Sequence, residues 1–145
     1  MPAEYSHYTF GQKVLEQLDG NTKEIIEENK TLFNIGLHGP DLLFYFKPLG
    51  SNPVNNLGKG IHKETGEKFL ARARKVILDC PDKKAATAYI LGFVCHFMLD
   101  TECHPIVRQG EKLGFSHVEI ETEMERVLMN EANLVPIKYK TTKHL

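Results

Sequence analysis

Apolar residues recur at helical spacing along most of the chain. The first such stretch places Phe10, Val14 and Leu18 on one side of a helix. No stretch alternates between apolar and polar residues for long enough to predict a strand. We therefore expect an all-α protein with five helices, at residues 8–19, 22–33, 61–78, 83–102 and 116–130.

Capping residues predict where two of these helices begin. Asp82 precedes the fourth helix and suits its N-cap, because a short acidic side chain can accept a hydrogen bond from a free backbone N–H. Ser116 precedes the fifth helix, and Glu119 stands at the matching capping-box position. Pro105 is expected to lie just beyond the end of the fourth helix, since proline cannot continue the backbone hydrogen-bond pattern.

Glycine and proline predict where helices are interrupted. Gly20 is expected to end the first helix. The segment 36–60, GLHGPDLLFYFKPLGSNPVNNLGKG, is rich in Gly, Pro and Asn. It predicts a loop with one helical turn around residues 42–46.

Composition places the chain among ordinary globular proteins. Its 145 residues suit one domain spanning residues 1–145, and 41% of them are hydrophobic. The net charge is −1, with 18 basic and 19 acidic residues, which argues against a nucleic-acid-binding surface of general positive charge. No apolar run reaches the length of a transmembrane helix, and no basic segment precedes an apolar one at the N-terminus. We therefore expect a cytoplasmic protein.

The three cysteines agree with a reducing compartment. Cys80, Cys95 and Cys103 form no CxxC pair, and their odd number does not suit a disulfide framework. We expect them to pack as small apolar side chains.

Candidate chemistry begins in YILGFVCHFMLDTECHPIV, residues 89–107. His96 and Asp100 stand four residues apart, so they lie on one face of a helix. Their neighbours are mostly apolar, and an ionised carboxylate buried among apolar residues is costly unless it is paired or bound to a metal. An imidazole and a carboxylate on adjacent turns can chelate one metal ion.

A second pair with this spacing is His117 and Glu121, in HVEIE. Taken alone, it is better explained as a surface contact, because the helix is heavily charged. Other candidate ligands lie farther apart in sequence: His7, Asp41 in HGPD, His62 in GKGIHKE, and His104 four residues after Asp100. His38 and His144 have no carboxylate at helical spacing, and we do not expect either to bind a metal.

These candidates supply nitrogen and carboxylate oxygen without thiolate, which suits zinc, manganese or iron. They are more than one ion needs, so two or three ions would be held, with some ligands shared. Asp100 is the natural bridging carboxylate, because it lies between two histidines.

The order of these motifs resembles that of a known family. HYTFG, HGPD, a lone His, GFVCHFMLDTECHP and HVEIE follow one another over about residues 5–121. This order resembles the zinc-dependent phospholipase C family, which includes bacterial phosphatidylcholine-preferring phospholipase C and alpha-toxin. It is more distantly similar to the S1/P1-type nucleases.

The resemblance implies a compact multi-helix fold with a trinuclear zinc site in a cleft. It also implies which side chains hold each ion, with Asp100 bridging two of them. The first ion would be held by Asp41, His62, His96 and Asp100, the second by His7 and Asp100, and the third by His104, His117 and Glu121.

The activity implied by the resemblance is hydrolysis of a phosphodiester, with a phospholipid as one substrate. Asp41 would orient or deprotonate the attacking water. Two alternatives stay open: a nuclease or phosphomonoesterase with a soluble substrate, and a non-catalytic metal-binding module. Aromatic residues for base stacking exist at Phe44, Tyr45 and Phe46, although such residues more often belong to a core.

The chain departs from the family pattern at both ends. The secreted enzymes bind zinc through an N-terminal tryptophan, and this chain contains no tryptophan. The Pro2 amine is the candidate replacement if Met1 is removed. The chain also ends soon after the last expected ligand, at VPIKYKTTKHL. We therefore expect either a more open cleft or a chain that is a fragment of a longer protein.

Overall fold

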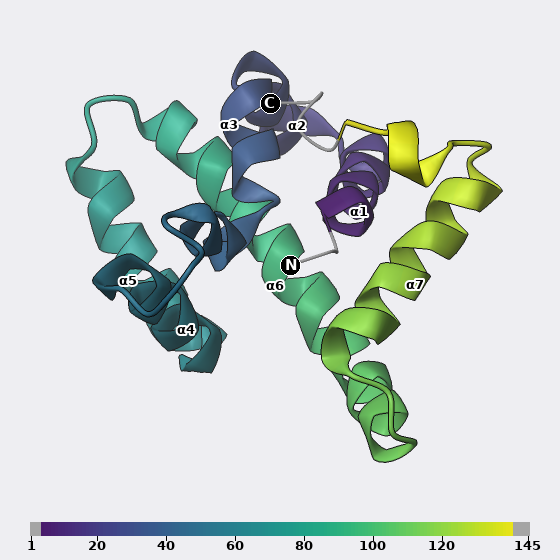
Figure 1. Cartoon of the computed structure of the whole chain (residues 1–145). Coiled ribbons are helices and arrows are strands. Elements are labelled where there is room, and N and C mark those ends of the chain that lie inside the picture. The colour runs from purple at the N-terminus through teal and green to yellow at the C-terminus, as the bar shows by residue number, and fades with distance from the viewer. Residues whose placement is uncertain (1–3, 141–145) are drawn as a thin grey trace.

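The computed structural model describes residues 4–140, and these residues form helices without any strand. The all-α prediction is therefore confirmed over the described part of the chain. Figure 1 shows the arrangement of the elements. In chain order they are α1 (Glu4–Gln17), α2 (Gly20–Glu28), α3 (Lys30–Gly36), the 3₁₀ helix η1 (Gly39–Tyr45), α4 (Pro53–Lys63), α5 (Gly66–Asp79), α6 (Lys83–Lys112), α7 (His117–Glu131) and the 3₁₀ helix η2 (Pro136–Lys138).

The long helix α6 is the centre of the fold. It contacts α1, α2, α3, α5, α7 and η1, and in Figure 1 it runs between α4 and α5 on one side and α7 on the other. The main apolar cluster lies where α1, α2 and α3 pack on the first half of α6. Its buried members are Leu15, Ile26, Phe33, Leu37, Ala88 and Cys95.

Two glycines allow α3 and α6 to cross in backbone contact. A Cβ atom on Gly36 would lie 2.1 Å from the carbonyl oxygen of Tyr89. A Cβ atom on Gly92 would lie 2.2 Å from the carbonyl oxygen of Phe33. Both distances are far below van der Waals contact, so only glycine permits this approach. The crossing fixes the end of α3, from which the chain continues directly into the HGPD segment.

The predicted capping residues are confirmed. The Asp82 carboxylate accepts a hydrogen bond from the Ala85 backbone N–H at 2.9 Å, and α6 begins at the next residue. Ser116 and Glu119 form the complete capping box at the start of α7.

The predicted end of the fourth helix was wrong. Pro105 lies inside α6, which continues to Lys112. The helix ends where Gly114 adopts a positive φ of 99°, a conformation that glycine takes without a steric penalty. Packing of the second half of α6 outweighs the lost hydrogen bond, because Val107, just beyond the proline, is almost completely buried.

Other helix boundaries also differ from the prediction. The helix expected at 61–78 is interrupted, because residues 61–63 end α4 and α5 begins only at Gly66. The helix expected at 22–33 is two helices that meet at Asn29, whose φ and ψ are not helical. Gly20 begins α2 rather than ending α1. The segment 36–60 contains most of α4 in addition to η1. Asn52 caps α4 by accepting hydrogen bonds from two backbone N–H groups, a signal that the glycine-rich composition obscured.

The cysteines agree with the prediction: Cys80, Cys95 and Cys103 are free thiols. Within residues 4–140, no helix combines the length and apolar character needed to span a membrane.

Candidate metal centre

The folding of the chain brings all eight predicted ligands together in three groups. Within each group, one ligand atom from every residue lies within 4.8 Å of the others. The groups are His7, His96 and Asp100; Asp41, His62 and His96; and His104, His117 and Glu121. Metal ligation by each residue stays a prediction, but their convergence from five helical elements is an observation.

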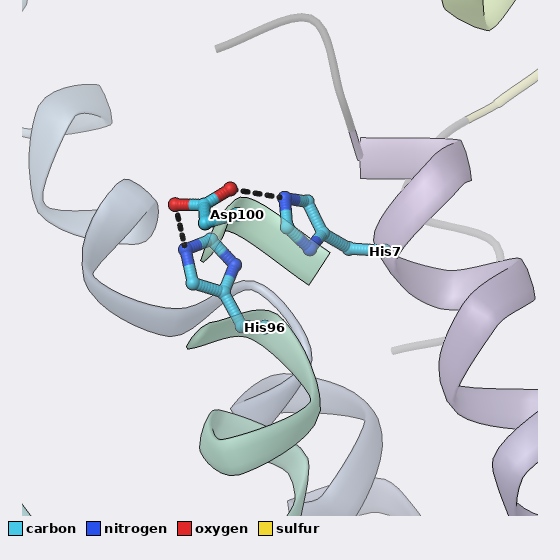
Figure 2. A group of neighbouring side chains, drawn as sticks. All are labelled: His7, His96 and Asp100. Carbon is cyan, nitrogen blue, oxygen red and sulfur yellow. Dashed lines mark ion pairs between the residues drawn. The ribbon is translucent and has the colours of Figure 1, made fainter. Parts of the chain in front are cut away.

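Asp100 lies between two imidazoles, as Figure 2 shows. Its Oδ1 is 3.3 Å from Nε2 of His7, which comes from α1. Its Oδ2 is 3.3 Å from Nε2 of His96, one turn earlier on α6. The two imidazole rings stack with centroids 4.0 Å apart. One carboxylate therefore faces a separate nitrogen with each of its oxygens, which is the geometry of a bridging ligand.

Burial is strong for the histidines and weaker for the carboxylate. His7 and His96 are 3% and 2% exposed, whereas the Asp100 side chain is 22% exposed. The expectation that Asp100 lies deep among apolar side chains was wrong in degree. Phe97 and Met98, which precede it on α6, are themselves substantially exposed.

The electrostatic environment keeps Asp100 ionised. Burial alone would raise the pKa of its carboxyl, but the adjacent imidazoles of His7 and His96 hold that pKa well below its usual range. Burial lowers the pKa of His7, although Asp100 partly opposes this effect. The site thus combines an anion with a His7 imidazole that resists protonation, and a metal ion binds these forms of both groups.

The hydrogen bond on the far side of His96 indicates where its lone pair points. Nδ1 of His96 lies 3.2 Å from the backbone carbonyl oxygen of Leu37. A carbonyl oxygen only accepts hydrogen bonds, so Nδ1 carries the hydrogen and Nε2 carries the lone pair. That Nε2 atom is buried and makes no hydrogen bond with any described residue. A lone pair facing a carboxylate favours a cation between them, and either a proton or a metal ion fits this arrangement.

His62 and Asp41 repeat this arrangement on α4 and η1. Nδ1 of His62 donates to the carbonyl oxygen of Gly58 at 2.9 Å, and Nε2 faces Oδ1 of Asp41 at 3.0 Å. The hydrogen bond with Asp41 raises the pKa of His62. For Asp41, burial opposes ionisation, but the hydrogen bond from His62 lowers its pKa overall. A cation, either a proton or a metal ion, is therefore favoured between these two side chains.

The third group lies between the second half of α6 and the start of α7. Nε2 of His117 is 2.9 Å from Oε1 of Glu121, and the His104 and His117 rings have centroids 5.5 Å apart. Nδ1 of His117 lies 3.3 Å from Oε1 of Glu111. Sequence reasoning missed Glu111. A carboxylate on the outer nitrogen of a metal-binding histidine orients the ring and increases its basicity.

His104 joins this group because α6 continues through Pro105. The prediction that His104 lies at or beyond the helix end was wrong, and its position inside α6 directs it towards α7. His38 is buried and belongs to none of the three groups. The Pro2 amine and His144 lie outside the described residues.

A glycine in the HGPD segment makes room for His96. Gly39 has a φ of 53°, and a Cβ atom there would lie 2.4 Å from Cδ2 of the His96 ring. Only a residue without a side chain allows η1 to approach this ring, and the approach brings Asp41 towards His96. Close packing against His96 and the positive φ therefore explain why glycine occupies this position of HGPD.

The family model for zinc-dependent phospholipase C matches residues 6–145. The chain belongs to this family. The membership predicted from the order of the histidine and carboxylate motifs is therefore confirmed, and it supports zinc as the metal. No curated protein and no solved structure matches the chain significantly.

A cavity of about 210 Å³ adjoins the candidate ligands of this family member. Its polar lining includes His62, His96, Asp100 and His104. The apolar lining consists of Pro40, Ile61, Phe93 and Phe97. Polar groups that converge within an apolar wall are typical of a small-molecule site.

A buried carboxylate on α7 holds α1 in place beside this centre. Oε1 of Glu125 accepts a hydrogen bond from the backbone N–H of Ser6 at 3.1 Å. Glu125 is 8% exposed, and burial raises its pKa to about 7. Its partner precedes His7, so Glu125 positions the turn of α1 that carries this ligand. Sequence reasoning missed this role, since 119 residues separate the two partners and no local pattern connects them.

Proposed function

We propose that this protein is a zinc-dependent phosphodiester hydrolase of the phospholipase C type, with two or three zinc ions. The observation that carries the proposal is the position of Asp100 between Nε2 atoms of two histidines, at 3.3 Å from each. Asp100 shares its ligand group with His96, His96 also belongs to the group of Asp41 and His62, and the cavity lies beside both residues. Membership in the zinc-dependent family supports the choice of metal.

Each ion is assigned to one group of side chains. Asp41, His62, His96 and Asp100 would hold one ion, and His7 and Asp100 would hold the second. Asp100 would therefore contribute to both ions. His104, His117 and Glu121 would hold the third. When bound, zinc lowers the pKa of a ligated water towards neutrality and stabilises negative charge on phosphoryl oxygens.

Asp41 is the candidate for orienting the attacking water. Its Oδ1 faces His62, and a carboxylate accepts hydrogen bonds at both oxygens, so Oδ2 can accept one from water. The low pKa of Asp41 keeps the carboxylate ionised at neutral pH, which suits an acceptor that holds water in a fixed direction. The apolar cavity wall strengthens electrostatic interactions by lowering the local dielectric constant.

The test uses the full chain reconstituted with zinc. Turnover is measured on bis(p-nitrophenyl) phosphate and on phosphatidylcholine vesicles, with and without chelator, while circular dichroism follows the helices. We expect the chelator to abolish turnover, zinc to restore it, and the helical signal to persist. Complete zinc loading with no turnover on any phosphodiester would instead support a non-catalytic metal-binding module.

A soluble substrate is the second candidate. Tyr45 and Phe46 follow the HGPD segment and are about half exposed, so they are available for stacking on a base. Parallel assays with a single-stranded oligonucleotide and with p-nitrophenyl phosphate separate the substrates. Turnover on either, without turnover on phosphatidylcholine, would assign a nuclease or phosphomonoesterase activity.

A further inference from the structure

One side chain of the cavity carries a charge that the metal centre does not use. Arg108, on α6, lines the same cavity as Asp100 and His104. No lysine and no other arginine lines this cavity among the described residues. A permanent positive charge beside a set of metal ligands does not help those ligands to hold a cation, so it requires another explanation.

The helical register directs Arg108 along the cavity. It follows His104 by one turn and Thr101 by two, so all three lie on one face of α6. Helical side chains lean towards the N-terminus of their helix, so the Arg108 side chain extends back towards His104 and the candidate ligands.

The guanidinium group is not committed to another part of the fold. Arg108 forms no hydrogen bond or ion pair with any residue in the range 4–140. Its polar neighbours have other partners: the Thr101 hydroxyl donates to the Phe97 carbonyl at 2.8 Å, and the Glu111 carboxylate faces His117. The guanidinium group of an arginine binds two oxygens of a phosphate at once, and it stays protonated and positively charged at any physiological pH.

We propose that Arg108 binds an oxyanion of a phosphate group of the substrate in this cavity. The inference rests on the proposed function, since it assigns a substrate-binding residue to the same site. The phosphate is either the one being cleaved or a second one elsewhere in the substrate. In both cases the cavity favours substrates that bring negative charge to the Arg108 end, and a cationic group there would be repelled.

Binding of inorganic phosphate to the zinc-loaded full chain tests this directly by calorimetry. Arg108→Gln removes the charge and the guanidinium group, whereas Arg108→Lys keeps the charge alone. Lys112→Gln is the matched control, because it removes one positive charge one turn farther along α6 and outside the cavity lining. We expect Arg108→Gln to weaken phosphate binding by about 10-fold or more, the loss typical of a hydrogen bond to a charged group. The phosphate affinity of Arg108→Lys should lie between those of wild type and Arg108→Gln, and the phosphate affinity of Lys112→Gln should stay within about twofold of wild type.

Zinc content and phosphate affinity together decide the outcome. Unchanged phosphate affinity in Arg108→Gln would overturn the proposal. An equal loss of phosphate affinity in Lys112→Gln would also overturn it, because it would indicate a non-specific effect of positive charge on α6. Loss of zinc from Arg108→Gln would overturn it too, because Arg108 would then support the metal centre.

Turnover distinguishes the source of the phosphate. If Arg108 binds the cleaved phosphate, Arg108→Gln lowers kcat/KM for bis(p-nitrophenyl) phosphate. If it binds a second phosphate, kcat/KM falls only for diesters that carry an additional phosphate. Phosphate binding that depends on Arg108 in a protein without hydrolytic activity would support this inference while contradicting the proposed function.

Discussion

Replacing Gly39 by alanine tests how the fold positions the candidate metal centre. The substitution adds a single methyl group and removes no proposed ligand. Its Cβ atom would lie 2.4 Å from Cδ2 and 2.5 Å from Cγ of the His96 ring. His96 belongs to two of the three ligand groups, so its displacement would affect both.

The expected effect follows from these distances. Ordinary van der Waals contact begins near 3.4 Å, so the ring or the η1 backbone must move by about 1 Å. Metal–nitrogen distances tolerate deviations of about 0.2 Å, and the displacement is several times larger. The φ of 53° at this position adds a cost of about 1–2 kcal/mol for alanine. We expect zinc affinity to fall by at least about 10–100-fold, the loss seen when a partner of a metal ligand is removed.

The assay is competitive zinc titration against a chromogenic chelator, with circular dichroism recorded on the same samples. Gly60→Ala is the matched control, because this glycine lies in α4 and a Cβ atom there meets nothing within 4 Å. It should keep wild-type zinc affinity and gain up to about 1 kcal/mol of stability from the higher helix propensity of alanine. Wild-type zinc affinity in a folded Gly39→Ala protein would refute the reasoning, since it would show that the His96 ring is free to move.

Three further predictions concern the bridge, the helix crossing and the buried carboxylate. Asp100→Asn should lower bound zinc by about two equivalents in elemental analysis, whereas His38→Ala should leave the zinc content intact; the opposite pattern would contradict the assignment of ligands. Gly92→Ala should destabilise the fold by about 1–3 kcal/mol in urea unfolding, because overpacking against the Phe33 carbonyl exceeds the gain in helix propensity, and unchanged stability would show that α3 can move away without cost. The folded-state pKa of Glu125 is raised from 4.5 to about 7, so the folded state binds more protons and stability falls as pH rises through this window. Glu125→Gln should remove this fall from the pH dependence of the zinc-free protein, measured as the difference from wild type, and an identical pH profile would contradict the burial argument.

Local chemistry explains why much of the helical structure was predictable. Asp82 and the Ser116–Glu119 pair satisfy backbone groups within a few residues of themselves, so their effect is visible in the sequence. The pairs His96–Asp100 and His117–Glu121 depend only on helical geometry, and both are in contact. The order of the motifs likewise sufficed to predict the family.

Packing between distant segments explains the errors and the omissions. Pro105 is a local signal to end a helix, but burial of Val107 stabilises α6 beyond it, and this continuation places His104 beside His117. The roles of Glu125 and Arg108 depend on partners or spaces that form only when helices come together. The convergence of α1, η1, α4, α6 and α7 on one centre required the tertiary structure, because the contact of Gly36 with α6 and the room left by Gly39 arise from three-dimensional packing, which sequence spacing does not encode.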